Sequence, residues 1–151
     1  MREAPETRAG TDAGHVMVLM IGYVLLALLV VTVVAAAGSL YLGQKKLLSI
    51  ADGAALAAAD TFVLSGGSST GDPGTLLNNQ GVLSAAQDYL AGIETPTTIG
   101  GIALAPGTGA PDGHTAYVAM TAVVHPLFIN FLVPDGIPIK VTSTARANLE
   151  L

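Results

Sequence analysis

The chain has 151 residues, of which 51% are hydrophobic and only 11% are charged, and its formal net charge is −5 at pH 7. This length is typical of one domain, and the few basic and aromatic residues are scattered, so nucleic-acid binding is not expected. Because the chain contains no cysteine, a disulfide scaffold, a thiolate metal site and a cysteine nucleophile are excluded.

A long apolar segment dominates the N-terminal part of the chain. After a short N-terminal segment (residues 1–14), Val16–Leu42 contains no formally charged residue and is almost wholly apolar. A bilayer core of ~30 Å needs roughly 20 helical residues, and hydrocarbon forces every backbone group to bond within the segment. We therefore predict a transmembrane helix over residues 15–43, in which Thr32 and Ser39 bond back to the preceding turn. The residues expected to anchor this helix, or to bundle it with others, are Val16, Leu19, Leu25, Leu28, Val31, Val34 and Leu42.

Two other interpretations of the apolar segment need to be weighed. The run Ala35–Ala37 before Gly38 is similar to a secretory cleavage site, which predicts a protein released after Ala37. The apolar stretch ahead of that site is longer than in a typical signal peptide, and acidic residues offset the two N-terminal arginines, which favours a retained anchor. A buried helix of a soluble protein is disfavoured, because the remaining part of the chain, about 100 residues, is too small to cover it.

The charges that flank the apolar segment do not decide its orientation. Arg2 and Arg8 on one side balance Lys45 and Lys46 on the other. The C-terminal part is rich in Gly, Ser, Thr and Pro, which favours an exported domain. We therefore expect the N-terminus inside and the C-terminal domain outside the cytoplasm. Lys45 and Lys46 are expected at the interface, either as simple anchors or in contact with anionic headgroups.

The helical pattern continues beyond the apolar segment into an alanine-rich block. We predict a helical stem over residues 44–64, so that one nearly continuous helix runs from about His15 to about Leu64, with Gly43 and Gly53 as weak points. Small side chains at this spacing let another helix approach closely, either a partner's helix or an element of the chain's own outer domain. The residues assigned to this helix docking are Ala51, Ala54, Ala55, Ala58 and Ala59.

Residues 65–151 are predicted to form a small extracytoplasmic α+β domain. Thr75–Ala91 has the pattern of an amphipathic helix, and Gly92 follows as its C-cap. Its expected buried stripe contains Leu83, Ala86 or Gln87, and Leu90. This second helix is expected to pack on a small antiparallel β-sheet.

Three β-strands are predicted after Pro96. Thr97–Leu104 and Thr115–Val124 are rich in β-branched residues and flank a turn-forming loop, which indicates a β-hairpin. Ile137–Asn148 alternates apolar and polar residues, and Pro138 suggests an edge strand or a strand start. The sequence Pro126–Val133 is a compact apolar patch between the second and third strands.

Two consecutive stretches carry a family resemblance. GHVMVLMIGYVLLALLVVTVVAAAGSLYL followed by QKKLLSIADGAALAAAD resembles the N-terminal segment of TadE/TadG-like (TadG-related) proteins, over about Ala13–Asp60. That family is associated with Flp (tight-adherence) pilus assembly in bacteria. The resemblance implies a pilin-like architecture, an anchor in the cytoplasmic membrane and a place in a type IV-like filament system or at the cell surface. It also implies that the partners are other pilus or pseudopilus subunits, copies of the same chain and the Tad secretion machinery.

The family also suggests Gly14–His15 as a candidate processing point. Pilin-like members of the TadE kind usually carry a Glu five residues after that point, where this chain has Leu19. The carboxylate that would pair with a neighbouring subunit's N-terminus is therefore missing, which counts against pilin-type processing.

The function predicted from these features is that of a structural or assembly component of a Tad/Flp pilus system, and not of an enzyme. No catalytic motif or cofactor motif is present, and the three histidines lack partners at metal-ligand spacing, so no catalytic, cofactor or metal site is assigned. The alternatives are a membrane-tethered binding module, with the apolar patch around Leu127–Val133 as its contact surface, and the protein released after Ala37.

Overall fold

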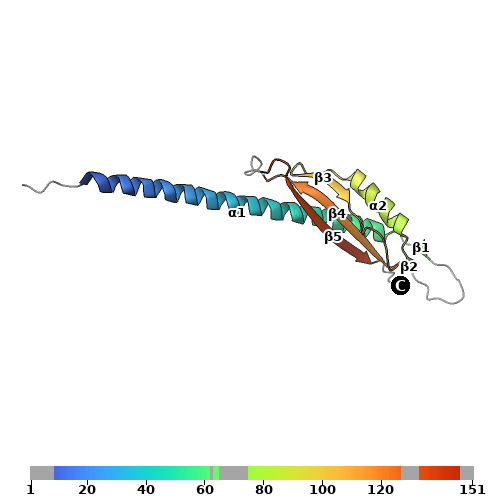
Figure 1. The fold of residues 1–151 in the computed structure, drawn as a ribbon. Helices are drawn as coiled ribbons and strands as arrows, with labels where there is room; N and C mark the ends of the chain where they lie inside the picture. Colours follow the sequence, from blue (N-terminus) through green and yellow to red (C-terminus); the bar gives the residue numbers. More distant parts are fainter. Residues whose placement is uncertain (1–8, 62, 65–74, 127–132, 147–151) are drawn as a thin grey trace, which may run out of the picture.

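The computed structural model describes residues 9–61, 63–64, 75–126 and 133–146. Its elements, in chain order, are α1 (Ala9–Ala59), β1 (Val63–Leu64), β2 (Thr75–Leu76), α2 (Asn79–Gly92), β3 (Ile99–Leu104), β4 (Thr115–Val124) and β5 (Ile137–Arg146). Figure 1 shows that the N-terminal part of α1 stands alone, whereas its C-terminal part lies within a small domain that the other elements complete. The predicted α+β class, with a long N-terminal helix, is confirmed.

The apolar segment and the alanine block form one unbroken helix, as the sequence predicts. The hydroxyl of Thr32 donates to the carbonyl oxygen of Leu28, and that of Ser39 donates to Ala36, both at 2.8 Å. These are the predicted bonds to the preceding turn. They satisfy both hydroxyls within the helix, so neither is left as an unpaired polar group on its apolar surface.

The helix ends earlier than the predicted Leu64. At Thr61 the backbone N–H and the hydroxyl both donate to the carbonyl oxygen of Ala58, at 3.2 and 2.7 Å. These bonds satisfy one of the carbonyl groups left without a helical partner at the end of α1, and they form the turn that ends the helix. The next residues form β1, which pairs with β2 in an antiparallel two-stranded ladder, so Val63 and Leu64 belong to a strand.

The three-stranded sheet is an antiparallel meander in the order β3-β4-β5. Its strands confirm the predicted hairpin and the predicted third strand, and β5 is an edge strand. Pro138 lies opposite Val123 near the start of β5. A proline is tolerated there because an edge strand bonds to a neighbour on one side only.

The second helix begins later than predicted, because the first residues of the predicted segment form β2. Asn78 is its N-cap, and the side-chain oxygen accepts a hydrogen bond from the backbone N–H of Gln80 at 3.0 Å. The predicted C-cap at Gly92 is wrong: Gly92 is the last helical residue, and Ile93 continues in an extended conformation without a left-handed cap.

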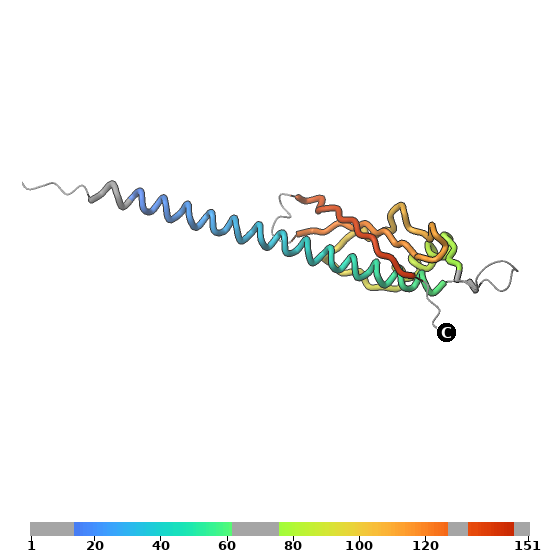
Figure 2. Tube along the Cα trace, turned by 90° about the horizontal axis from the view of Figure 1, so that it is seen from below, coloured from blue at the N-terminus to red at the C-terminus, as the bar shows by residue number. Residues whose placement is uncertain are grey.

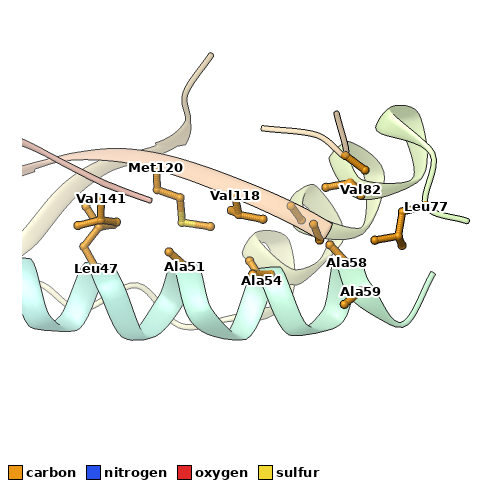
Figure 3. Close-up of a cluster of buried hydrophobic side chains, with 14 of the residues drawn as sticks. Leu47, Ala51, Ala54, Ala58, Ala59, Leu77, Val82, Val118, Met120 and Val141 are labelled. Atoms are coloured by element: carbon orange, nitrogen blue, oxygen red, sulfur yellow. The ribbon is translucent and has the colours of Figure 1, made fainter. Parts of the chain in front are cut away.

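The sheet and the helices form two layers around one core. The C-terminal part of α1 contacts both β4 and β5, and α2 lies beside α1 and also contacts β4. Figure 3 shows Leu47, Ala51 and Ala54 of α1 pointing toward Val118, Met120 and Val141 of the sheet. Most of the sheet is therefore covered by the predicted stem, with the second helix at its side.

The buried face of α2 shares Ala86 with the predicted stripe, which is confirmed at that position, but it has Val82 where Leu83 is predicted. Val82 and Ala86 are fully buried, while Leu83 and Leu90 are only half-buried and Gln87 is exposed. The helix is turned in this way because it packs against α1 as well as against the sheet.

Candidate functional site

Within the part of the chain that the structure describes, α1 is not covered by another element over Val16–Val34. The large apolar side chains from Val16 to Val34 are 51% to 70% exposed and surround the helix on all sides. Among the described residues, this is the helix that is long and apolar enough to cross a membrane. A soluble monomer rarely exposes an apolar patch of more than a few hundred Å², so this segment needs either lipid or other apolar helices around it.

The residues assigned to anchoring and bundling all lie on this exposed part. Val16, Leu19, Leu25, Leu28, Val31, Val34 and Leu42 are each more than half exposed. The candidate processing point at Gly14–His15 lies inside α1, which begins at Ala9, and both of its residues are exposed. Leu19 follows on the same uncovered helix, and no described side chain lies against Gly14.

The folded domain begins directly after the exposed segment. Leu42 is 62% exposed, whereas Gly43 is buried, and a Cβ at Gly43 would lie 2.5 Å from Cγ2 of Val124. Only a residue without a side chain lets the helix approach the end of β4 this closely. Helix and domain are therefore joined without a spacer, and α1 passes through the junction without a break.

The docking alanines lie inside the chain's own core. Ala51, Ala54, Ala55 and Ala58 are fully buried and Ala59 is nearly so. They contact the sheet and α2, so the alanine block packs against the chain's own domain and not against a partner's helix. A partner cannot reach them unless the core opens, so we do not retain them as a partner-docking surface.

A second close approach occurs where α2 crosses the alanine block. A Cβ at Gly53 would collide with the hydroxyl oxygen of Tyr89. Gly53 thus makes room for the tyrosine that packs α2 against α1. From the sequence alone, Gly43 and Gly53 are expected only as weak points of the helix. Their role as contact positions depends on partners that are distant in the sequence.

The two aspartates of the stem, Asp52 and Asp60, have different surroundings. Asp52 accepts a hydrogen bond from the hydroxyl of Ser143 on β5, so it ties the helix to the sheet edge. Asp60 is exposed in the turn after the helix.

Lys45 and Lys46 are exposed just past the apolar segment, and the Lys45 ammonium lies 5.6 Å from the centre of the Tyr41 ring.

The loop before β4 is held by a carboxylate. Asp112 accepts hydrogen bonds from the hydroxyl of Thr115 and from the backbone N–H groups of His114 and Thr115, at 2.7, 3.0 and 2.8 Å. The Thr115 hydroxyl first, and then these N–H groups, lower the pKa of Asp112 to about 2. This is turn chemistry. Within the described part of the chain, no three His, Asp or Glu side chains come together as metal ligands.

The structure thus joins an exposed apolar helix, without a break, to a small α+β domain. Residues 14–61 match the family model described as putative Flp pilus-assembly TadE/G-like. This is the family that the sequence resembles, and the match relates the chain to Flp pilus assembly, a structural process rather than a known class of enzyme. The matched segment contains both the exposed apolar helix and the buried alanine block. No curated protein and no solved structure matches the chain.

The predicted contact patch at Leu127–Val133 lies outside the described residues except for its last residue, Val133, which is half-buried. Pro126, just before it, is fully buried at the end of β4.

Proposed function

We propose that the protein is a membrane-anchored structural or assembly component of a Tad/Flp pilus system. The observation that carries this proposal is the exposed apolar helix, Val16–Leu42, joined rigidly to a folded domain. At 1.5 Å per residue the segment is roughly 40 Å long, which exceeds a bilayer core of ~30 Å. The family match over residues 14–61 supports the pilus context.

The proposed mechanism uses two environments for the same helix. In the cytoplasmic membrane the apolar side chains contact lipid, with the N-terminus inside and the domain outside. In a filament they contact the helices of neighbouring subunits, which replaces one apolar environment by another at little cost. Because the stem is part of the core of the domain, the position of the helix in a bundle also sets the position of the domain.

The same helix properties bear on the candidate processing point. No carboxylate lies on α1 between Asp12 and Asp52, so assembly of the helices would rest on apolar packing rather than on an ion pair with a neighbour's N-terminus. N-terminal sequencing of the mature protein distinguishes the outcomes. His15 as the first residue indicates pilin-type processing, Gly38 indicates release after Ala37, and an intact start indicates a retained anchor.

Single cysteines test the topology, because the chain has none of its own. We expect Ser84→Cys, on the exposed side of α2, to react with a membrane-impermeant maleimide on intact cells. Ala9→Cys, at the start of α1, is expected to react only after lysis. The reverse pattern would contradict the orientation, and a full-length monomer in the soluble fraction would contradict the anchor.

Shearing of surface filaments tests the pilus role. For a filament subunit, we expect the protein to co-purify with sheared filaments. In cells that lack the Tad machinery, we expect the protein to remain in the membrane fraction. A monomeric ectodomain that binds a defined ligand, with no association with filaments or with their assembly machinery, would favour the membrane-tethered binding module instead.

A further inference from the structure

A groove lies between α1 and β5 at the end of the domain that adjoins the apolar segment. It has a volume of about 450 Å³, which falls in the range of small-molecule sites. Figures 1 and 2 both show β5 running alongside α1 in this region. The groove is lined by Tyr41, Gln44, Lys45 and Leu48 from α1 and by Lys140, Val141 and Thr142 from β5.

The lining is suited to a phosphate group with apolar material attached. Lys45 and Lys140 both line the groove, although they come from elements far apart in the sequence. The tyrosine and threonine hydroxyls and the Gln44 amide add neutral donors, and none of the described residues that line the groove is acidic. Lys45 lies over the Tyr41 ring, which holds this cation at the groove.

The depth of the groove follows from the length of the apolar segment. A bilayer is ~30 Å thick in its hydrocarbon core and ~40–45 Å with its headgroups. Centring Val16–Leu42 in the core places Tyr41 about 3 Å beyond its outer edge and the backbone of Lys45 about 9 Å beyond it, from where the long lysine side chain extends back to the level of the headgroups. The buried Gly43 keeps the domain at this level, because no spacer lifts it away from the membrane.

We propose that the groove between α1 and β5 binds the phosphate of an anionic phospholipid of the outer leaflet, with Lys45 and Lys140 as its two cations. The inference rests on the proposed membrane anchoring. Because the two lysines come from the helix and from the sheet edge, one bound headgroup holds the domain in a single orientation on the membrane surface. This orientation presents the other faces of the domain to neighbouring subunits before assembly.

Native mass spectrometry of the full-length protein in neutral detergent tests the site. Phosphatidylglycerol is the probe, and phosphatidylcholine and inorganic phosphate are the comparison ligands. We expect phosphatidylglycerol to be retained in preference to phosphatidylcholine. A lysine near an anionic surface contributes about 1 kcal/mol, so each of Lys45→Gln and Lys140→Gln should weaken retention about fivefold, and the double variant about 25-fold.

Two matched controls separate a built site from diffuse attraction. Lys46→Gln removes a neighbouring exposed charge that does not line the groove, and Arg146→Gln removes one from the far end of β5. Both should retain the lipid as the wild type does. Equal losses in Lys46→Gln and Lys45→Gln, or wild-type retention in the double variant, would overturn the proposal. Displacement of the lipid by millimolar inorganic phosphate would assign the groove to a free anion and would also overturn it.

Vesicle flotation keeps this inference distinguishable from the proposed function. A full-length chain that fails to float with phosphatidylcholine vesicles has no membrane anchor, and the proposed function then fails as well. A chain that floats but shows no preference for phosphatidylglycerol retains its anchor and loses only the lipid site. Unchanged circular dichroism of the variants confirms that lost retention is not lost folding.

Discussion

The junction at Gly43 allows a sharp test of how the helix and the domain are joined. In an open helix, replacing glycine by alanine stabilises the fold by about 0.5–1 kcal/mol, because the unfolded chain loses freedom. At Gly43 the added methyl would lie 2.5 Å from Cγ2 and 3.1 Å from Cγ1 of Val124. Carbon atoms prefer about 3.5–4.0 Å, so α1 and β4 would have to separate by about 1 Å.

The valine cannot simply rotate away from the new methyl. It is branched at Cβ, so its side chain is stiff, and it is almost fully buried. Overpacking of this kind costs about 1–3 kcal/mol, which outweighs the gain in helix propensity. We therefore expect Gly43→Ala to lower the free energy of unfolding by about 1–2 kcal/mol.

Urea unfolding of the full-length protein in micelles, followed by circular dichroism, measures this change. Gly81→Ala in α2 is the matched control, because its nearest neighbour is the Thr61 hydroxyl at 3.5 Å, an ordinary contact. It should stabilise the domain by about 0.5–1 kcal/mol. In a double-mutant cycle, Val124→Ala should relieve much of the cost of Gly43→Ala. A stabilising Gly43→Ala would refute the close approach of α1 to β4.

Three further predictions address the core, the loop before β4 and the apolar part of α1. Ala54→Leu should lower the free energy of unfolding by about 1–3 kcal/mol, because it overpacks the core. Leu56→Ala, at a side chain that is 64% exposed, should change that free energy by less than about 0.5 kcal/mol. Equal effects of the two variants in urea unfolding would contradict the assigned helix face. The lowered pKa of Asp112 should contribute stability that is fully present above about pH 4 and is lost as the pH falls toward about 2. If NMR finds that the Asp112 carboxyl titrates at its ordinary value of 3.8, the hydrogen bonds to it are contradicted. Leu28→Arg should reduce the amount of protein recovered in carbonate-washed membranes, since an arginine at the middle of a spanning helix raises the free energy of insertion by about 2.5–3.5 kcal/mol. Unchanged recovery of the variant would argue against a spanning position.

The elements of this fold follow from local patterns in the chain. The apolar run and the alanine block both predict helix, and the structure joins them in α1. The β-branched stretches around the Gly/Pro loop predict the hairpin of β3 and β4, and alternation predicts β5. Such patterns are readable because each depends on residues only a few positions apart.

The details that depend on distant partners were not predictable in the same way. The end of α1 depends on the turn at Thr61 and on the pairing of Val63 with Leu76. The buried face of α2 depends on how that helix is shared between α1 and the sheet. The grouping of Lys45 with Lys140 in one groove likewise requires the register of β5 along α1.

The sequence by itself determined that an apolar helix precedes a small α+β domain, because hydrophobicity and periodicity are properties of neighbouring residues. It left two uses for the alanine block, since small side chains permit close packing without specifying the partner. Only the tertiary structure decided that the sheet and α2 take that place, and that Gly43 and Gly53 allow it. A close contact is a property of two surfaces, and the second surface here lies tens of residues away along the chain.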